Sequence, residues 1–228
     1  MLFAILLTKY LLPMSIYLLA DDVYDFPSAN LATPDGLLAI GGDLSTERLI
    51  IAYSSGIFPW YNEDEPILWW SLDPRMVMKP TELKITKSLR KTIDSNKFSC
   101  SIDTNFDKVI EMCANVERKD QDGTWICSDM IAAYKELHRL GFAHSVETYY
   151  DNELVGGLYG VCVGKCFIGE SMFSLVPSAS KLALIVLAKY MQQHGGRFID
   201  CQLETPHLKS MGGRFISYDQ YMEILKDS

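Results

Sequence analysis

The sequence predicts an α+β fold in which a mostly antiparallel sheet is flanked by helices. Runs of strand-forming residues separated only by two-residue turns indicate an antiparallel meander over 144–150, 153–163 and 166–173. An apolar-striped segment of helical period, 178–194, then leads to a further strand at 198–203. Helices that precede and follow a meander in this way are typical of an α+β domain.

The first half of the chain predicts a short apolar segment and then a helix. Residues 36–42 are apolar and end in a glycine pair, and Ser45 is positioned to cap a helix that Gly56 ends. The glycine pair fits neither GxGxxG nor GxxxxGK, so a nucleotide-binding loop is not predicted.

Cap and stop residues predict the remaining helices. We expect a helix over 104–113 with Thr104 as its cap, and another over 128–140 that Gly141 ends. Gly195 ends the helix that begins near residue 178, and Ser217 with Gln220 forms a capping box for the last helix.

The first twenty residues are strongly apolar. Lys9 and Pro13 interrupt them and no basic region precedes them, so we expect neither a signal peptide nor a membrane partner. Residues 1–13 are interpreted as an extension before Met14, or as an edge strand or helix packed on the body.

Composition predicts an ordinary globular protein, with 48% hydrophobic and 22% charged residues. The six cysteines form no CxxC pair, and no histidine follows them at the spacing of a zinc site, so no metal is expected. Buried reduced thiols fit a cytoplasmic protein. Pairing of Cys162 with Cys166 across a hairpin is the alternative.

A basic segment interrupts an acidic protein. The net charge is −8, yet residues 79–97 carry a local charge of +4, which leaves −12 for the rest. Such a segment suits contact with a few phosphates, or it is a solvated helix face.

Tryptophans gather in one part of the chain. Trp60, Trp69 and Trp70 lie within eleven positions, and Trp125 stands apart. Their side chains form a core or the wall of a pocket on which a base stacks. The four histidines are scattered and are interpreted as structural.

Two acids stand in apolar strand sequence. Glu170 lies in GESMFS, and Asp200 follows thirty residues later in IDCQ, two residues before Gln202. A buried carboxylate is costly unless it is paired or functional, so each acid is either held by structural hydrogen bonds or used in chemistry.

A series of ordered motifs between about Phe26 and about Phe215 resembles the leucyl/phenylalanyl-tRNA–protein transferase family. These motifs are GLLAIGGDLS, AYSSGIFPWY, PILWWSLDPR, GTWI, ELVGGLYGV, GESMFS, ASKLAL, HGG and IDCQ. The resemblance implies an enzyme that takes Leu or Phe from aminoacyl-tRNA. It passes the residue to the N-terminal amine of a protein that begins with Arg or Lys, which marks that protein for degradation.

For the fold, the resemblance implies a small N-terminal domain, 1–72, and a larger domain, 73–228, similar to acyl-CoA N-acyltransferases. No cofactor is expected, because the chain has no R/QxxGxG/A loop for a coenzyme A pyrophosphate. The alternatives are a coenzyme A-dependent N-acetyltransferase on the same scaffold, and a non-enzymatic RNA-binding module.

The resemblance also implies roles for individual residues. Asp200 and Gln202 take the proton chemistry, with Asp200 either a direct base or the organiser of a shuttle through the ribose hydroxyl, and Glu170 holds the aminoacyl amino group or orders the site. Pocket positions for the Leu, Phe or Met side chain are Leu158, Met172, Leu187, Ile199 and Cys201. Trp60 and Trp125 hold the terminal adenosine, and Tyr53 and Tyr134 line the same cleft. The acceptor-stem phosphates meet Lys84, Lys87, Arg90 and Lys91.

Overall fold

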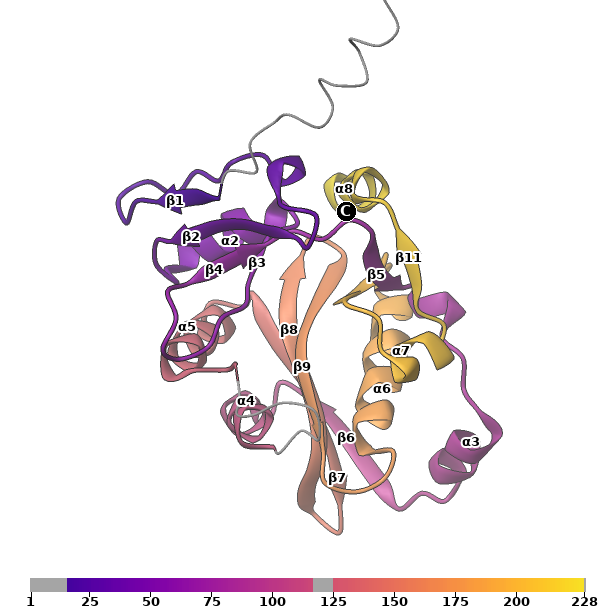
Figure 1. Cartoon of the computed structure of the whole chain (residues 1–228). Coiled ribbons are helices and arrows are strands. Elements are labelled where there is room, and N and C mark those ends of the chain that lie inside the picture. Colours follow the sequence, from indigo (N-terminus) through magenta and orange to yellow (C-terminus); the bar gives the residue numbers. More distant parts are fainter. Residues whose placement is uncertain (1–15, 117–124, 228) are drawn as a thin grey trace, which may run out of the picture.

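The computed structural model describes residues 16–116 and 125–227, which form two sheets with helices around them (Figure 1). The proposed extension 1–13, and the first two residues of the GTWI motif, lie outside the described residues. The elements confirm the predicted α+β class.

The smaller sheet comes from the N-terminal part of the chain. Its strands lie in the order β1-β2-β4-β3, with β1 (Tyr17–Leu19), β2 (Leu37–Gly41), β3 (Phe58–Pro59) and β4 (Leu68–Trp70). Strand β1 lies parallel to β2 at the edge, and the other pairs are antiparallel. The first described residues therefore form an edge strand.

The larger sheet has seven strands in the order β11-β5-β10-β9-β8-β7-β6. Their bounds are β5 (Arg75–Met78), β6 (Phe98–Ile102), β7 (Ala143–Tyr150), β8 (Glu153–Val163), β9 (Cys166–Ser174), β10 (Ile199–Gln202) and β11 (Arg214–Ile216). Among the described strands of this sheet, only the β9–β10 pair is parallel. The predicted meander is β7, β8 and β9. Asp151 and Asn152 both have positive φ in the first turn, as a type I′ hairpin requires.

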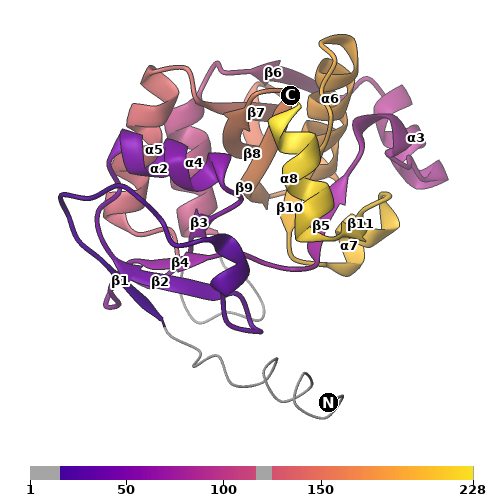
Figure 2. The same ribbon diagram turned by 90° about the horizontal axis from the view of Figure 1, so that it is seen from above.

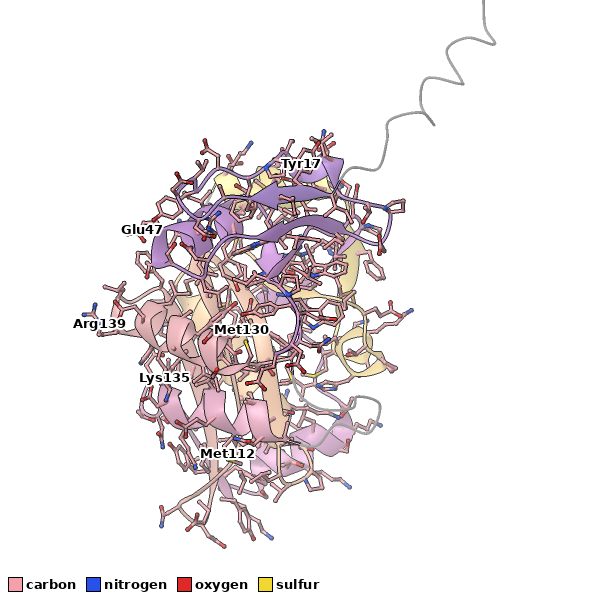
Figure 3. All side chains as sticks on the ribbon, turned by 60° about the vertical axis from the view of Figure 1, so that its left-hand side comes forward. Tyr17, Glu47, Met112, Met130, Lys135 and Arg139 are labelled. Carbon is pink, nitrogen blue, oxygen red and sulfur yellow. The ribbon has the colours of Figure 1, made fainter. Side chains whose placement is uncertain are left out.

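Helices cover both faces of this sheet (Figure 2). On one face lies α6 (Ala179–Gln193); on the other lie α4 (Phe106–Asn115) and α5 (Ser128–Arg139). The remaining helical segments are η1 (Ala29–Leu31), α2 (Thr46–Ser54), η2 (Pro80–Glu82), α3 (Lys87–Asp94), α7 (Pro206–Ser210) and α8 (Tyr218–Lys226). Figure 3 looks onto the α4 and α5 side, where Lys135 of α5 pairs with Glu111 of α4 at 2.9 Å.

Most predicted helix ends are confirmed. The Ser45 hydroxyl accepts from the Arg48 amide, and the Ser217 capping box is complete. Thr104 was wrong as a cap, because Asn105 occupies that position in α4. The Thr104 hydroxyl instead donates to Glu147, a fully buried carboxylate, at 3.0 Å. Leaving a buried carboxylate without donors costs more free energy than leaving a helix end uncapped, because water can hydrogen-bond to the exposed helix end.

The predicted domain boundary at residue 72 stays a prediction. The linker between β4 and β5 does lie there, but one hydrophobic core joins the two parts. Leu38 and Trp69 of the small sheet belong to the same buried cluster as Val109 and Tyr134 of α4 and α5. A second cluster lies on the α6 side of the large sheet and includes Leu187.

The six cysteines are free thiols. Cys162 and Cys166 do not pair, because they project from opposite faces of the β8–β9 hairpin: Cys166 belongs to the first core, and Cys162 packs against the second. Among residues 16–116 and 125–227, no helix has the length and apolar character needed to cross a membrane.

Gly156 of β8 allows α6 to begin directly against the sheet, since a Cβ there would lie 2.5 Å from the Ala179 Cβ. We expect Gly156→Ala to lower the free energy of unfolding by about 1–3 kcal/mol. Adding Ala179→Gly removes one of the clashing atoms, so the double variant should lose less than the two single variants summed. Urea denaturation of the four proteins measures this. Purely additive losses would show that the close approach is not the cause.

Candidate active site

The site forms where the parallel strands β9 and β10 separate. Their ladder pairs Ile199 with Phe167 and Asp200 with Ile168. Beyond this last pair the two strands no longer hydrogen-bond to each other. Glu170 of β9 and Gln202 of β10 lie past the end of the ladder, where a hollow opens between the strands. The topology therefore places the two acids noted in the sequence near each other, although thirty residues separate them.

Asp200 is fully buried and surrounded by donors. The Arg75 guanidinium of β5 donates to both carboxylate oxygens, with Nη2 2.7 Å from Oδ2 and Nε 3.0 Å from each oxygen. Tyr221 of α8 donates its hydroxyl to Oδ2 at 2.9 Å, and the Gln202 amide donates to Oδ1 at 2.9 Å. This carboxylate is a paired structural charge with protein partners on both of its oxygens.

Glu170 has a different environment. It is half-buried, and its carboxylate accepts hydrogen bonds from Tyr53 at 2.7 Å and from Tyr134 at 3.0 Å. Burial raises the pKa of Glu170 to about 7; the tyrosine hydrogen bonds oppose this rise, and the nearby charge of Asp200 adds to it. Near neutral pH the side chain therefore exists in both protonation states.

We expected Tyr53 and Tyr134 to line the cleft, and among the described residues neither side chain belongs to the hollows at this site. Both are buried beneath Glu170, and their hydroxyl groups also hydrogen-bond to each other. Helices α2 and α5 bring them there from positions 81 residues apart, where they fix the orientation of the carboxylate. Their buried hydroxyls need partners, which explains why they turn toward Glu170 rather than toward solvent.

An apolar pocket of about 390 Å³ lies beside Glu170. It brings together all five side chains that we expected to hold the aminoacyl side chain: Leu158, Met172, Leu187, Ile199 and Cys201. Burial raises the pKa of the Cys201 thiol, so this wall behaves as an apolar surface.

A second hollow, of about 260 Å³, has an aromatic wall. Trp60 and Trp125 both line it and both are half-buried, whereas Trp69 is fully buried in the core. The carbonyl of Trp60 accepts a hydrogen bond from the Trp70 indole at 2.7 Å, which fixes the backbone of this wall. Glu170, Cys201 and Gln202 line both this hollow and the apolar pocket, so the two are continuous.

A third, more polar hollow of about 710 Å³ adjoins the same point. Three carboxylate residues line it: Asp73, Glu204 and Asp219. Asp73 accepts a hydrogen bond from the Tyr218 amide, and Glu204 pairs with Lys209. Gln202 lines all three hollows, at an irregularity in the β10–β5 pairing where its φ is +52°. A strained backbone of this kind is characteristic of functional sites.

The basic segment is an exposed surface at the edge of the molecule (Figure 1). Thr86 caps α3, and Leu89 anchors this helix in the core on the α6 side. Within the described part of the chain, none of the four predicted phosphate contacts is in an ion pair: Lys84, Lys87, Arg90 and Lys91. The Lys84 amide donates to the Met211 carbonyl, so the segment adjoins the end of α7.

Three residues of the site carry no signal in the sequence that would have identified them. Arg75 and Tyr221 hold Asp200, and no local pattern links them to it, although Arg75 lies in the PILWWSLDPR motif. His207, interpreted as structural, lines the apolar pocket, and within the described residues its two buried ring nitrogens have no hydrogen-bond partner. Burial and the nearby Lys181 lower its pKa, which keeps the imidazole neutral.

In the described residues, no three or more His, Cys, Asp or Glu side chains are grouped so that they could hold a metal ion.

Comparison with known proteins finds extensive similarity. Residues 77–226 match the family model described as leucyl/phenylalanyl-tRNA protein transferase, and residues 42–73 match the model of its N-terminal domain. A leucyl/phenylalanyl-tRNA–protein transferase of Hydrogenovibrio crunogenus is 55% identical over 203 residues, which cover 88% of this chain and 79% of that protein. Its counterpart in Flavobacterium johnsoniae is 51% identical over 211 residues, covering 92% and 99%.

Among solved structures, the chain is similar to FemX, with a TM-score of 0.47 and 12% identity over 75% of this chain and 66% of that one. It is also similar to L-PGS from Bacillus licheniformis, with a TM-score of 0.41 and 13% identity, covering 83% and 64%.

The Arg75–Asp200 pair predicts a specific pattern of stability. Arg75→Met leaves a buried carboxylate without its cation, so we expect a loss of about 3–5 kcal/mol in the free energy of unfolding. Combining it with Asp200→Leu removes the stranded charge and should recover most of that loss. Urea denaturation of the single and double variants measures both. A single-variant loss below about 1 kcal/mol would contradict the structural role of the pair.

Proposed function

The chain belongs to the leucyl/phenylalanyl-tRNA–protein transferase family and is therefore an aminoacyltransferase that uses aminoacyl-tRNA, and we propose that it moves Leu or Phe onto proteins that begin with Arg or Lys. The observation that carries this proposal is the convergence of three different hollows on Gln202. A transfer of this kind has three parts to hold: the amino acid, the end of the tRNA and the acceptor.

We assign the apolar pocket to the side chain of the transferred amino acid. Its volume of about 390 Å³ and its apolar walls favour Leu or Phe over charged residues. Met172 lines the pocket and has the flexibility to adapt to a branched or an aromatic side chain. Because a hydrophobic pocket discriminates weakly between side chains of similar size, we expect some transfer of Met as well.

We assign the aromatic hollow to the terminal adenosine of the tRNA. Trp60 and Trp125 are partly exposed there, and a base stacked on an indole gains about 1–3 kcal/mol without sequence readout. The free cations from Lys84 to Lys91 then meet phosphates of the acceptor stem, which position the tRNA but do not read its sequence. Lys84 is near α7, which also lines the cleft, and this placement supports the assignment.

We assign the polar hollow to the acceptor protein. Its carboxylates, Asp73, Glu204 and Asp219, complement the cationic side chain of an N-terminal Arg or Lys. Gln202 connects this hollow with the other two, which would bring the acceptor amine beside the ester. The product carries Leu or Phe at its N-terminus, and in our proposal this residue marks the protein for degradation in the cytoplasm.

In the proposed reaction the acceptor amine attacks the carbonyl carbon of the aminoacyl ester. A C–N bond forms, the bond from the carbonyl carbon to the ribose oxygen breaks, and the proton lost by the amine ends on that oxygen. The amine has a reference pKa of roughly 8, so it must give up a proton. Glu170, with a pKa of about 7, is suited to accept and return a proton near neutral pH, directly or through a water molecule.

Asp200 takes a different part in this proposal. Its carboxylate is buried and both of its oxygens are held by Arg75, so direct proton removal would first require breaking that pair. We propose that Asp200 orients Gln202, because its carboxylate accepts a hydrogen bond from the backbone amide of Gln202. Of the two roles that the resemblance leaves open for Asp200, this geometry favours the organiser of a shuttle through the ribose hydroxyl.

A transfer assay tests the function. We expect the purified chain to move labelled leucine from leucyl-tRNA to a peptide with N-terminal Arg, without added metal or nucleotide. A matched peptide with N-terminal Asp should react far less, because the polar hollow repels its charge. If the folded protein leaves the label on fresh leucyl-tRNA but acetylates the peptide from acetyl-coenzyme A, the alternative N-acetyltransferase function would replace ours.

The pKa of Glu170 predicts a pH dependence. We expect wild-type kcat/KM to rise from pH 6 to 8, and Glu170→Gln to lower it by about 100-fold at pH 8. The acceptor amine titrates in both proteins, so the ratio of wild type to variant isolates the contribution of Glu170. A ratio that does not change with pH would exclude proton transfer by this side chain.

Stability provides the matching control. The Glu170 pKa is raised above its ordinary value of 4.5, so the folded chain binds this proton more tightly than the unfolded chain does. Its contribution to stability is therefore lost as the pH rises from about 4.5 to about 7. Relative to Glu170→Gln, the wild type should lose on the order of 2 kcal/mol of unfolding free energy across that window.

A further inference from the structure

A separate cavity of about 230 Å³ lies between the sheet and the C-terminal end of α6. It shares Phe167 and Leu187 with the apolar pocket, so the two cavities lie on either side of these side chains. Three side chains with the chemistry of a thiol nucleophile site line this cavity, and the proposed transfer reaction uses none of them: Asp103, His144 and Cys162.

The strand register places these groups together. His144 of β7 pairs with Gly160 of β8, and side chains two residues apart project from the same face of a strand. Cys162 is thus the diagonal neighbour of His144 on the cavity side. On the other side of the imidazole, His144 Nδ1 lies 2.8 Å from Asp103 Oδ2.

Asp103 is the third member of this group, and hydrogen bonds to the Ser145 backbone position it. Its second carboxylate oxygen accepts the Ser145 amide at 2.9 Å, and its own amide donates to the Ser145 carbonyl. Its backbone has a φ of +56°, an uncommon conformation for a residue other than glycine. The Nδ1 hydrogen bond leaves the other ring nitrogen of His144 available to the thiol.

The protonation state of His144 fits this arrangement. The hydrogen bond to Asp103 raises the pKa of His144 to about 10, and a hydrogen bond with Cys162 contributes, while burial opposes the rise. At neutral pH the imidazole is therefore charged. A charged imidazole beside Cys162 stabilises the negative charge that develops on a cysteine sulfur as it attacks an electrophile. His138, near Asp103, and the exposed Lys165 and His194 at the cavity are the other basic groups in this region.

We propose that Cys162 is a nucleophilic thiol that small anionic disulfides modify, with His144 and Asp103 as its positioning residues. In the reaction the Cys162 thiol loses its proton to solvent, and the thiolate attacks one sulfur of the disulfide. A new S–S bond forms at Cys162, the original S–S bond breaks, and the second half leaves as a thiolate. Lys165 at the cavity provides the positive charge that attracts an anionic reagent.

The other cysteines provide internal comparisons. Cys113, Cys127 and Cys166 are buried, and burial raises the pKa of Cys201. Cys100 is an exposed residue with a partly buried sulfur. This burial and the charge of Glu147 raise its pKa, and a hydrogen bond with Thr148 lowers it. Exposure alone predicts that Cys100 reacts first, whereas the grouping of Cys162 with His144 and Asp103 predicts that Cys162 does.

The test treats the full-length folded protein with 5,5′-dithiobis(2-nitrobenzoate) and locates the mixed disulfides by mass spectrometry at a series of times. We expect Cys162 to react about tenfold faster than Cys100 at neutral pH. This comparison needs no variant, so it does not depend on how a mutated protein folds. Faster reaction at Cys100, or at any other cysteine, would overturn the proposal.

Variants then test the positioning residues. His144→Gln and Asp103→Asn should slow labelling of Cys162 by about tenfold and leave labelling of Cys100 unchanged. Cys100→Ser is the matched control and should leave the Cys162 rate unchanged. If His144→Gln folds with a native circular dichroism spectrum and Cys162 still reacts at the wild-type rate, His144 has no role in its reactivity.

Discussion

The site depends on the buried ion pair between Arg75 and Asp200. It joins three elements that are distant in sequence, because Arg75 comes from β5, Asp200 from β10 and the third partner, Tyr221, from α8. Separating the pair would leave an unpaired charge in the protein interior, which costs free energy, so these contacts hold β10 in one position. Gln202 lies two residues after Asp200, and its backbone amide donates to the Asp200 carboxylate. The three hollows of the cleft meet at Gln202.

Glu170, the other acid of the site, has no cationic partner in direct contact, and its pKa differs for that reason. Tyr53 and Tyr134 supply hydrogen bonds but no positive charge, and burial therefore raises its pKa to about 7. Two carboxylates on adjacent strands thus have different chemistry because their surroundings differ. In our proposal the paired acid keeps the site in shape, and the acid whose pKa lies near neutrality handles protons.

The local elements of the fold could be predicted because their signals are local. Alternation and turn residues located β7, β8 and β9, and Gly195 ended α6 as expected. The failures were long-range. Thr104 looked like a helix cap, but a buried glutamate 43 residues away takes its hydroxyl. Tyr53 and Tyr134 were expected at the cleft, and the structure directs both hydroxyl groups to the half-buried carboxylate of Glu170, which lies between their helices and needs donors.

The sequence by itself determined the strands, the helices, the basic segment and the motifs that carry the family resemblance, since each depends on neighbours within a few residues. Only the tertiary structure decided which acid receives a cation, because Arg75 and Asp200 are 125 residues apart. It also decided that Trp60 lines a hollow while Trp69 fills the core, and that Cys162 meets His144. The physical reason is that burial and charge pairing depend on the packing of distant segments, which no local pattern records.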